Sequence, residues 1–544
     1  MQQWENIFSR ENVLHELCRL RLRLAARRQR EMLEPWRVTQ NSAPEPVGKI
    51  FPRRSEWNRF RPKGRRGISS DKVALQTLLR ATTTLSRIQP TPVWAKMLDE
   101  TICRIQWRAL HDPCFRFNPP KVTPVPKEPG QEIWRPICKF GLEDAVINSL
   151  TSRYWRELID PIFLPSCLAF RTGKLTAGRD TGVEYLLQFR QQHADRPLYV
   201  AEVDLQAFYD CLDHDVARTR IHGLALQIEQ SGGWVSRRAI AVVDAYLSCY
   251  AFPKAETISA RNPKGRYAWP FESLANLHPD LNAAQIGIPQ GGAISNLLVN
   301  VILHEVDEAM ATLFPDGKPG CYLRYCDDMV IVAPEEKQCA KAFEEVLRIL
   351  QHQLRLPVHP PETVTKYNSD FWKAKSRKPY RWCSPRVASD APWVQFLGYQ
   401  VRFDGEVRIA KKSLRRQQAR ILTEANRVLQ YSAPSNQAGT RFLRRICNRL
   451  INLSVGKNGV RHAWPVNCWS DGFRLVHQRI RFVSPLKTLD RYREKNIRRI
   501  LRLGKTRGWM LPDIKRKGFA YSYIARFAIS KKTRRESISI GLKM

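Results

Sequence analysis

Residues 322–333 read YLRYCDDMVIVA and place two adjacent aspartates between apolar runs. The flanking runs have the composition of short strands, so the stretch predicts two strands that meet at Asp327-Asp328. Neighbouring carboxylates repel each other and Asp is a poor strand former, so this pair is locally unfavourable. A divalent cation such as Mg²⁺, which binds carboxylate oxygens and substrate phosphates, is the simplest compensation. The alternative is an ordinary turn, in which an Asp-Asp pair is common.

A third carboxylate ends another apolar strand. The segment Tyr199–Val203 is short and apolar, Asp204 follows it directly, and the aromatic residues Phe208 and Tyr209 come close behind. Three carboxylates in one place could hold two ions about 4 Å apart, the arrangement that in-line phosphoryl transfer uses. The alternative is that Asp204 ends its strand and caps the next turn.

A glycine-rich loop forms the third feature. Residues 288–292 read IPQGG and lead into a helical apolar period over Leu298–Val306. Paired glycines let a backbone approach a ligand closely, and Gln290 in such a loop could hydrogen-bond a templated nucleotide. Read alone, a Pro-x-Gly-Gly run is also ordinary loop chemistry.

The charge balance indicates a polyanionic partner. The chain has 544 residues, too many for one compact domain, and a net charge of +39. Residues 411–544 alone carry 33 Lys and Arg against 6 Asp and Glu, an excess that favours nucleic acid as the partner. No apolar run approaches the roughly 20 residues of a membrane helix. The 13 cysteines include no C-x-x-C pair, so we expect no zinc ribbon and a reducing, cytoplasmic location.

Local patterns predict several further elements. Leucines at helical spacing among arginines predict a helix near Val13–Leu33, either a solvated surface helix or an RNA-contacting extension. The proline-rich segment that follows residue 111 predicts a two-stranded finger, Val122–Pro126 and Ile133–Ile137, around a turn at Pro129-Gly130. Phe396–Phe403 reads as one more strand.

Taken together, these features resemble reverse transcriptases, especially the bacterial branch that includes the group II intron enzymes. The resemblance covers residues 111–405, and the matching blocks occur in the order that the family shows. The blocks are Pro126-Lys127 with Trp134–Ile137, Asp160–Phe163 with Ala169–Lys174, Val203–His214, Ile288–Asn300, Leu323–Val332 and Phe396–Tyr399.

The resemblance implies an α+β right-hand polymerase in which helices back an antiparallel palm sheet. The expected domains are a basic helical N-terminal extension (1–110), fingers (111–200), palm with fingers insertions (201–405), a helical thumb (406–490) and a basic C-terminal tail (491–544).

The resemblance also implies roles for individual residues. Asp204, Asp327 and Asp328, with the backbone carbonyl of Leu205, would bind two Mg²⁺ or Mn²⁺ ions. Tyr209 would exclude the ribose 2′ hydroxyl. The remaining nucleotide contacts would come from Lys127, Arg135, Gln206, Ala207, Phe208 and Gln290, and the primer contacts from Phe396, Leu397, Gly398 and Tyr399.

The chain departs from the family pattern at several places. Ala293 and Asn296 replace the usual prolines of the PQGGPLSP block, and Thr363 stands where a lysine is usual, with Lys366 the nearest substitute. The HNH-type endonuclease domain of many intron proteins, with its paired cysteines, is missing. This weakens the interpretation as a mobile-intron protein, and the long N-terminal extension and basic tail favour a standalone bacterial enzyme, by analogy with defence-associated reverse transcriptases.

The expected function is RNA-directed DNA synthesis that extends a 3′ hydroxyl with dNTPs by a two-metal mechanism. The expected partners are an RNA template, a DNA product and a dedicated structured non-coding RNA, with no membrane and with homo-oligomerisation left open. The alternatives are a maturase-like RNA-binding protein and a template-independent or protein-primed nucleotidyl transferase. An RNA-dependent RNA polymerase is a further alternative, against which Tyr209 argues.

Overall fold

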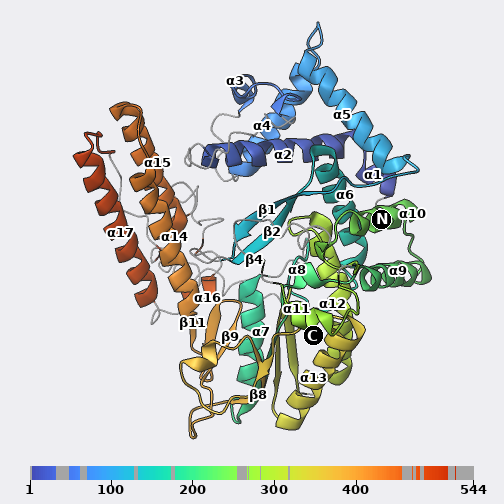
Figure 1. Cartoon of the computed structure of the whole chain (residues 1–544), viewed down its shortest axis with the longest axis vertical. Helices are drawn as coiled ribbons and strands as arrows, with labels where there is room; N and C mark the ends of the chain where they lie inside the picture. The colour runs from blue at the N-terminus through green and yellow to red at the C-terminus, as the bar shows by residue number, and fades with distance from the viewer. Residues whose placement is uncertain are drawn as a thin grey trace, which may run out of the picture. The chain divides into compact units, whose positions relative to one another are not determined.

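The chain is described from a computed structural model (Figure 1). The structure describes residues 3–31, 48–61, 70–127, 133–172, 178–253, 266–267, 269–281, 283–315, 319–455, 469, 473–477, 483–512 and 521. The chain divides into two compact units. The first unit comprises Met1–Arg21, Glu45–Phe60 and Thr77–Val394, and the second comprises Leu22–Pro44, Arg61–Gln76 and Gln395–Met544.

A five-stranded sheet forms the core of the first unit, with strand order β5-β6-β3-β8-β7. The four strands β5, β6, β3 and β8 are antiparallel to their neighbours, but β7 runs parallel to β8. The resemblance implied a purely antiparallel sheet, but the sheet is mixed. The reason is that a long crossover, instead of a tight turn, joins β7 to β8 and lets them run parallel. The strands are β3 Leu198–Asp204, β5 Cys321–Tyr325, β6 Asp328–Ala333, β7 Pro361–Glu362 and β8 Ser376–Trp382.

Helices cover this sheet and explain its apolar strands. Helix α13, Glu336–Arg348, packs on β3, β6 and β8, and α12, Ala293–Leu313, packs between α6, α9 and α13. Residues 329–333 of β6 are all buried, as a run of five apolar residues requires. The other helices of this unit are α1 Trp4–Ile7, α3 Arg54–Trp57, η3 Asn58–Phe60, α5 Val93–Leu110, α6 Leu142–Ile159, α7 Arg179–Gln192, α8 Phe208–Cys211, α9 His214–Gln230, α10 Arg237–Ser248, α11 Phe271–Ala275, η6 Ile349–Gln353 and η7 Asp370–Trp372.

A second, smaller sheet contains the predicted finger. Strands β1, Lys121–Pro126, and β2, Ile133–Lys139, pair antiparallel, which confirms the two predicted strands. Strand β4, Arg266–Tyr267, adds to β2 in parallel. The turn predicted at Pro129-Gly130 lies outside the described residues, as do Gly173 and Lys174 of the second block.

Two long helices contain residues of both units. Helix α2, Arg10–Glu31, confirms the helix predicted from the leucine spacing, and α4 spans Ser70–Leu85. Among the described residues, no helix combines the length and the apolar character that a bilayer crossing requires.

The second unit corrects one sequence prediction. Instead of one strand over 396–403, two strands, β9 Trp393–Phe396 and β10 Tyr399–Arg402, pair across a turn at Leu397-Gly398. Both turn residues have left-handed backbones, with φ of 53° and 83°, as tight two-residue hairpins need. Strand β11, Val407–Ile409, completes this sheet.

Three long helices dominate the rest of the second unit. Helices α14 Lys411–Gln430, α15 Asn436–Val455 and α17 Val483–Thr506 pack on one another, and α16 spans Arg474–His477. The boundary expected between residues 490 and 491 falls inside α17. Of the expected tail beyond this helix, the structure describes residues 507–512 and 521.

Candidate active site

Strand pairing brings two of the predicted aspartates together. Strands β3 and β6 are antiparallel neighbours, and their register pairs Asp204 with Asp328. Tyr325 of β5 is also opposite Asp328, so Asp327 lies in the tight turn between β5 and β6. This turn passes through Cys326, whose φ of 61° is left-handed. Residues that are far apart in sequence thus meet at one end of the sheet.

The electrostatics of Asp327 reveal a concentration of negative charge. Burial raises the pKa of Asp327, and the nearby Asp204 carboxylate raises this pKa further, while Lys375 acts in the opposite direction. A raised carboxylate pKa means that the ionised form is unfavourable in its surroundings. The two carboxylates therefore share a site where a bound cation would relieve both desolvation and repulsion.

The sequence reasoning missed Lys375, a cation that contacts Asp204. Its ammonium lies 2.9 Å from Asp204 Oδ2 and 3.3 Å from His359 Nε2. Hydrogen bonds of the Asp204 backbone hold Asp204, His359 and the Lys375-Ser376 pair together. The Asp204 N–H donates to Ser376 Oγ at 3.0 Å, and the Asp204 carbonyl accepts from the His359 N–H at 3.0 Å. The cation beside Asp204 is thus Lys375 rather than Lys366, the substitute that the sequence suggested. Only the pairing of β8 with β3, a non-local feature, identifies Lys375.

The residues present fit a divalent cation in part. Within the described ranges, no group of three or more His, Cys, Asp or Glu side chains is arranged to hold a metal ion. The pair Asp204 and Asp327 nevertheless offers the hard oxygen donors that Mg²⁺ prefers, and the raised pKa of Asp327 records a charge that lacks full compensation. The carboxylate pair is thus suited to a cation that takes its other ligands from a substrate.

The turn after Asp204 is built by contacts within the protein. The Gln206 N–H donates to the Pro357 carbonyl at 2.8 Å, and its side-chain amide donates to the Val358 carbonyl at 2.8 Å. The Gln206 N–H, expected to meet a triphosphate, is therefore engaged inside the protein. Leu205 forms a β-bridge with Val358, and Ala207 adopts a left-handed φ of 45° that starts α8 with the buried Phe208.

Tyr209 is joined to the glycine-rich loop. Its hydroxyl donates to Asn296 Oδ1 at 2.9 Å, and its carbonyl accepts from the Ile288 N–H at 2.7 Å. One residue on, Asp210 accepts from Gln290 Nε2 at 2.7 Å. Burial raises the pKa of Tyr209, so its hydroxyl stays protonated. The predicted sugar-contacting and nucleotide-contacting residues therefore belong to one hydrogen-bonded group.

The two loop glycines are required by the protein's own packing. A Cβ on Gly292 would lie 1.8 Å from the Tyr246 hydroxyl, and one on Gly291, whose φ is 114°, would lie 3.0 Å from the Cys138 carbonyl. The Gln290 carbonyl also accepts from the Cys138 N–H at 2.8 Å, which ties the loop to β2. Close approach is thus to β2 and α10 rather than to a ligand.

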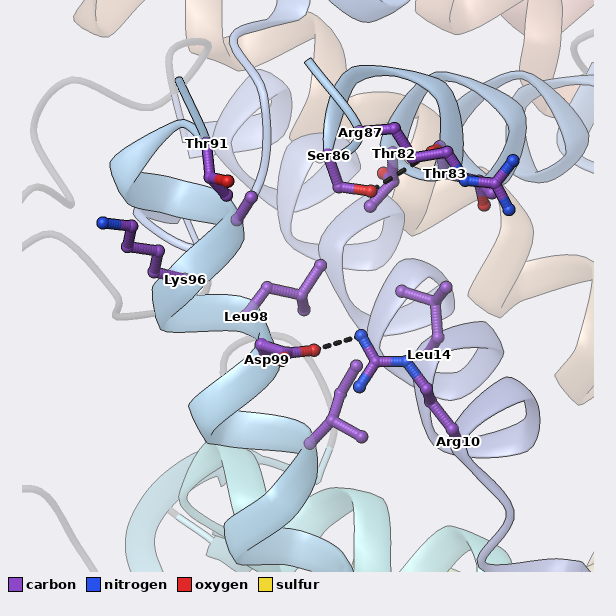
Figure 2. Close-up of a pocket in the computed structure, with 12 residues that line it drawn as sticks. Arg10, Leu14, Thr82, Thr83, Ser86, Arg87, Thr91, Lys96, Leu98 and Asp99 are labelled. Atoms are coloured by element: carbon purple, nitrogen blue, oxygen red, sulfur yellow. Dashed lines mark hydrogen bonds and ion pairs between the residues drawn. The ribbon is translucent and has the colours of Figure 1, made fainter. Parts of the chain in front are cut away.

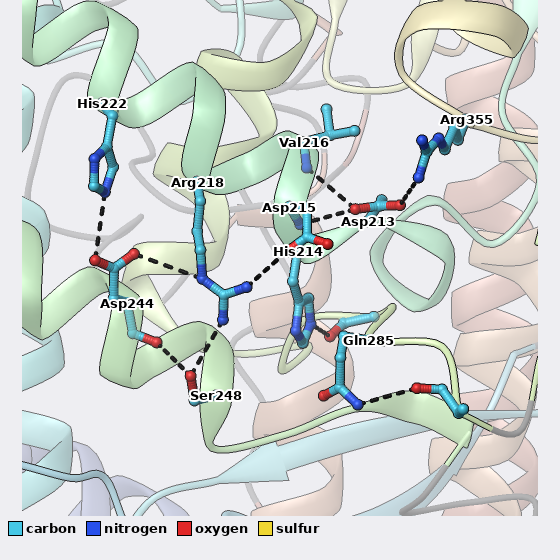
Figure 3. A network of polar contacts seen from close by, with 12 residues as sticks. Asp213, His214, Asp215, Val216, Arg218, His222, Asp244, Ser248, Gln285 and Arg355 are labelled. Carbon is cyan, nitrogen blue, oxygen red and sulfur yellow. Dashed lines mark hydrogen bonds and ion pairs between the residues drawn. The ribbon is translucent and has the colours of Figure 1, made fainter.

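A polar network secures the segment that follows α8 (Figure 3). Asp213 Oδ1 accepts from the Asp215 and Val216 N–H groups at 2.8 and 3.1 Å, which caps α9, and Arg355 donates to Asp213 Oδ2 at 3.2 Å. His214 Nε2 lies 2.7 Å from the Gly287 carbonyl. Burial lowers the pKa of His214, so this ring is neutral and Nε2–H is the donor. Through His214 and Gly287, the network joins the start of α9 to the residue just before the glycine-rich loop.

A buried ion pair joins the β5–β6 hairpin to helix α12. Arg324, fully buried, donates to both carboxylate oxygens of Asp307 at 2.7 and 2.5 Å and to Asn300 Oδ1 at 3.3 Å. Both Asp307 and Asn300 belong to α12. The pair therefore anchors the strand that precedes Asp327 to the central helix.

The two predicted triphosphate cations differ in placement. Lys127 and Arg135 are both exposed, just beyond β1 and on β2. The charge of Lys127 contributes to lowering the pKa of His359, after burial and Lys375, so Lys127 lies near His359, whose ring is 3.7 Å from Asp204 Oδ2. Arg135 shares the finger sheet with this lysine, and its proximity to the aspartates stays a prediction.

The predicted primer block lies in the second unit. Leu397 and Gly398 form the β9–β10 turn, and the Gly398 carbonyl accepts from the Ala410 N–H at 2.9 Å. A Cβ on Gly398 would lie 3.1 Å from Ser413 Oγ, and Phe396 and Tyr399 are buried. These residues therefore form a tight turn and its packing within that unit, and their contact with a primer stays a prediction.

A surface pocket of about 400 Å³ lies in the first unit, away from the aspartates in sequence (Figure 2). It lies between α2, α4 and α5, and Figure 2 shows the Arg10 guanidinium paired with Asp99 across it. Its rim carries the cations Arg87 and Lys96 and the hydroxyls of Thr82, Thr83, Ser86 and Thr91.

The first unit thus combines carboxylates at adjacent strand ends of a helix-backed sheet with a glycine-rich loop that is hydrogen-bonded to Tyr209 and Asp210. Residues 125–401 match the family described as reverse transcriptase (RNA-dependent DNA polymerase). The chain belongs to this family.

Similar proteins include Protein YkfC of Escherichia coli (strain K12), which is 26% identical over 23% of this chain and 44% of its own length. The chain thus spans less than half of this curated relative. Among solved structures, Candida tropicalis telomerase in complex with a TWJ fragment of telomeric RNA has a TM-score of 0.37 and 12% identity over 86% of this chain and 76% of its own. A truncated apo form of that telomerase has a TM-score of 0.34 and 16% identity over 54% and 55%.

Proposed function

We propose that the chain is an RNA-directed DNA polymerase that extends a 3′ hydroxyl with dNTPs. The observation that carries this proposal is the meeting of Asp204 and Asp327, two carboxylates from separate parts of the sheet, inside the residues that match the family. Carboxylates beside phosphates are unfavourable for binding alone, so their convergence favours catalysis over an RNA-binding scaffold.

Asp204 and Asp327, with the Leu205 carbonyl, are the groups that would hold Mg²⁺ or Mn²⁺. Asp328, opposite Asp204 in the register, contributes to the geometry of the hairpin. When bound, two such ions would activate the 3′ hydroxyl and neutralise the leaving pyrophosphate. The Lys375 ammonium compensates the Asp204 charge at 2.9 Å. Lys375 and Lys127 place positive charge where a triphosphate would develop negative charge in the transition state.

Tyr209 and Gln290 are proposed to select the nucleotide. The Tyr209 ring would clash with a ribose 2′ hydroxyl, and Gln290 would contact the incoming nucleotide with the part of its amide that Asp210 leaves available. Ala207 and Phe208 would contribute backbone contacts, and Arg135 would assist Lys127 from the finger strands.

The second unit is proposed to be the thumb, and α17 carries its main nucleic-acid surface. Six exposed cations follow one face of this helix, because they recur every three or four residues. The first and the last of them are 18 positions apart, which is about 27 Å at 1.5 Å per residue. We call them the α17 ridge: Lys487, Arg491, Lys495, Arg498, Arg502 and Lys505.

A groove accompanies the α17 ridge. Its volume is about 730 Å³, and four of the ridge cations line it together with Arg499 and Tyr492. Closely spaced cations favour a partner with regularly spaced phosphates, and releasing the counterions of that partner drives binding. The ridge and groove therefore support an RNA or RNA–DNA duplex backbone as the ligand, with the primer block Phe396–Tyr399 in the same unit.

The biological setting is part of the same proposal. A cytoplasmic bacterial enzyme of the group II intron-like branch would copy a dedicated structured RNA, as in an antiviral defence system. The support is the order of the sequence blocks and the large basic excess outside them. The hydroxyl- and cation-lined pocket of Figure 2 supports an RNA contact by the N-terminal extension.

The proposal is tested by primer extension with dNTPs on an RNA template, using Asp327→Asn with Asp204→Asn. We expect synthesis to fall by at least about 10³-fold, which corresponds to about 4 kcal/mol of activation free energy, while RNA affinity changes little. Asp195→Asn is the matched control, because Asp195 is 73% exposed and distant in sequence from the Asp327 turn. Full synthesis by the double variant would exclude the carboxylate assignment. RNA binding without synthesis by the unaltered protein would favour the maturase-like alternative.

A further inference from the structure

We propose that Asn296 is a positioning residue that fixes the Tyr209 ring and thereby sets the discrimination between deoxyribonucleotides and ribonucleotides. The inference rests on the proposed polymerase function. It assigns sugar selectivity to a residue outside the segment Asp204–Tyr209. Asn296 lies in the first turn of α12, whereas Tyr209 lies in α8, so the contact joins two separate parts of the first unit.

Tyr209 is held at both ends. Its carbonyl accepts from the Ile288 N–H at 2.7 Å, and its hydroxyl donates to Asn296 Oδ1 at 2.9 Å. Between these two anchors, the ring can neither swing about χ1 nor slide along its plane without breaking a hydrogen bond. The Cys326 thiol also contacts the hydroxyl, so the anchored end of the ring adjoins the turn that carries Asp327.

The direction of the hydrogen bond is fixed. Burial raises the pKa of Tyr209, so the phenol keeps its proton, and because an amide oxygen can only accept, the hydroxyl donates to Asn296 Oδ1. An Asn side chain supplies an acceptor in its carbonyl oxygen. Among the described residues, the side-chain oxygen that accepts from the Tyr209 hydroxyl is therefore that of Asn296.

The surrounding loop is stiff enough to make Asn296 a firm anchor. Ser295 donates to the Pro289 carbonyl at 2.8 Å and lies 2.7 Å from the Tyr246 hydroxyl, while the Ile294 N–H donates to Asn148 Oδ1 at 2.8 Å. In this chain, Ala293 and Asn296 occupy the positions of prolines in the PQGGPLSP pattern. In this chain hydrogen bonds, rather than prolines, restrict the conformation of the turn. Asn296 also adds a hydrogen-bond acceptor that a proline side chain does not have.

A steric gate works only as well as its ring is fixed. If the ring can retreat by a fraction of an ångström, its clash with a 2′ hydroxyl is relieved and ribonucleotides are admitted. Removing the anchor should therefore raise the ratio of ribonucleotide to deoxyribonucleotide kcat/KM. The expected rise is about tenfold, which equals about 1.4 kcal/mol, the size of one neutral hydrogen bond.

The test is single-nucleotide incorporation on an RNA template, with kcat/KM measured for a dNTP and for the rNTP of the same base. We expect Asn296→Ala and Tyr209→Phe each to raise the rNTP to dNTP ratio about tenfold. Because both variants break the same bond, the double variant should show no more than the larger single effect. Tyr209→Ala, which removes the ring, should raise the ratio much further, and Asn276→Ala, an exposed control in the same unit, should leave it unchanged.

Two results would overturn the inference while leaving the polymerase intact. One is an unchanged ratio in Asn296→Ala, and the other is additive effects in the double variant. Tyr209→Phe keeps the ring and removes only the hydroxyl, so it decides the question even if Asn296→Ala fails to fold. An unaltered protein that incorporates no dNTP would instead refute the proposed function, and the inference with it.

Discussion

The ion pair between Arg324 and Asp307 should be the most sensitive structural support of the site. Both side chains are fully buried, and the guanidinium donates to both carboxylate oxygens at 2.7 and 2.5 Å. Asp307→Asn keeps the shape but leaves the buried charge of Arg324 without its counter-ion. Breaking a buried pair in this way costs about 3–5 kcal/mol, a change of about 10²- to 10⁴-fold in the unfolding equilibrium constant.

The assay is urea denaturation followed by tryptophan fluorescence, with Asp370→Asn as the matched control. Asp370 pairs with Lys373 at 2.6 Å, but its side chain is 63% exposed, so its removal should cost less than about 1 kcal/mol. Replacing both partners, with Arg324→Met and Asp307→Leu, should recover much of the stability because no buried charge remains. Equal destabilisation by Asp307→Asn and Asp370→Asn would refute the reasoning.

Three further predictions follow from the site. Because burial and Asp204 raise the pKa of Asp327 while Lys375 lowers it, synthesis should fall as pH drops through that raised pKa, and Lys375→Gln should move this acidic limb to higher pH in a pH–rate profile. Gly292→Ala should lower the melting temperature, because its Cβ would overlap the Tyr246 hydroxyl, and adding Tyr246→Phe should restore part of the stability. Changing Lys495, Arg498 and Arg502 of the α17 ridge, which line the groove, to Gln should flatten the salt dependence of single-stranded RNA binding by about 0.7 in log K per log salt for each phosphate that the variant no longer neutralises; an unchanged slope would make the ridge a solvated face.

Local patterns in the sequence predicted the elements that carry the site. The apolar runs around Asp327 and before Asp204 became β3, β5 and β6, because burial on both faces demands continuous apolar residues. The strand expected over 396–403 was wrong, since Leu397 and Gly398 turn the chain in a way that periodicity does not reveal. Neither the parallel pairing of β7 nor its consequence, a mixed sheet, has a local signature.

The site was harder to predict where function depends on pairing between distant residues. Lys375 was missed because its contact with Asp204 exists only once β8 pairs with β3. The glycines at 291 and 292 were interpreted as making room for a ligand, but their neighbours are β2 and Tyr246. Composition and spacing indicate candidate residues for the chemistry, whereas the contacts that orient those residues require the fold.

The register of β3 illustrates this dependence most clearly. Glu202 lies two residues before Asp204, so both side chains project from the same face of the strand. Glu202 is nevertheless buried, paired with Arg377 opposite it on β8 and accepting from the Tyr380 hydroxyl at 2.6 Å. Burial raises the pKa of Glu202, while Arg377 lowers it, so the carboxylate depends on this partner.

If β3 slipped by one residue relative to its neighbouring strands, Glu202 would separate from Arg377 and Asp204 would turn to the opposite face of the sheet. The first consequence leaves an uncompensated charge in the core, which costs several kcal/mol, and the second dismantles the carboxylate pair. In the sequence, Glu202 interrupts an apolar strand and looks unfavourable, as the Asp327-Asp328 pair does. Its partner, Arg377, lies 175 residues away, so a residue that weakens the strand locally favours, through that partner, one alignment of β3 with β8.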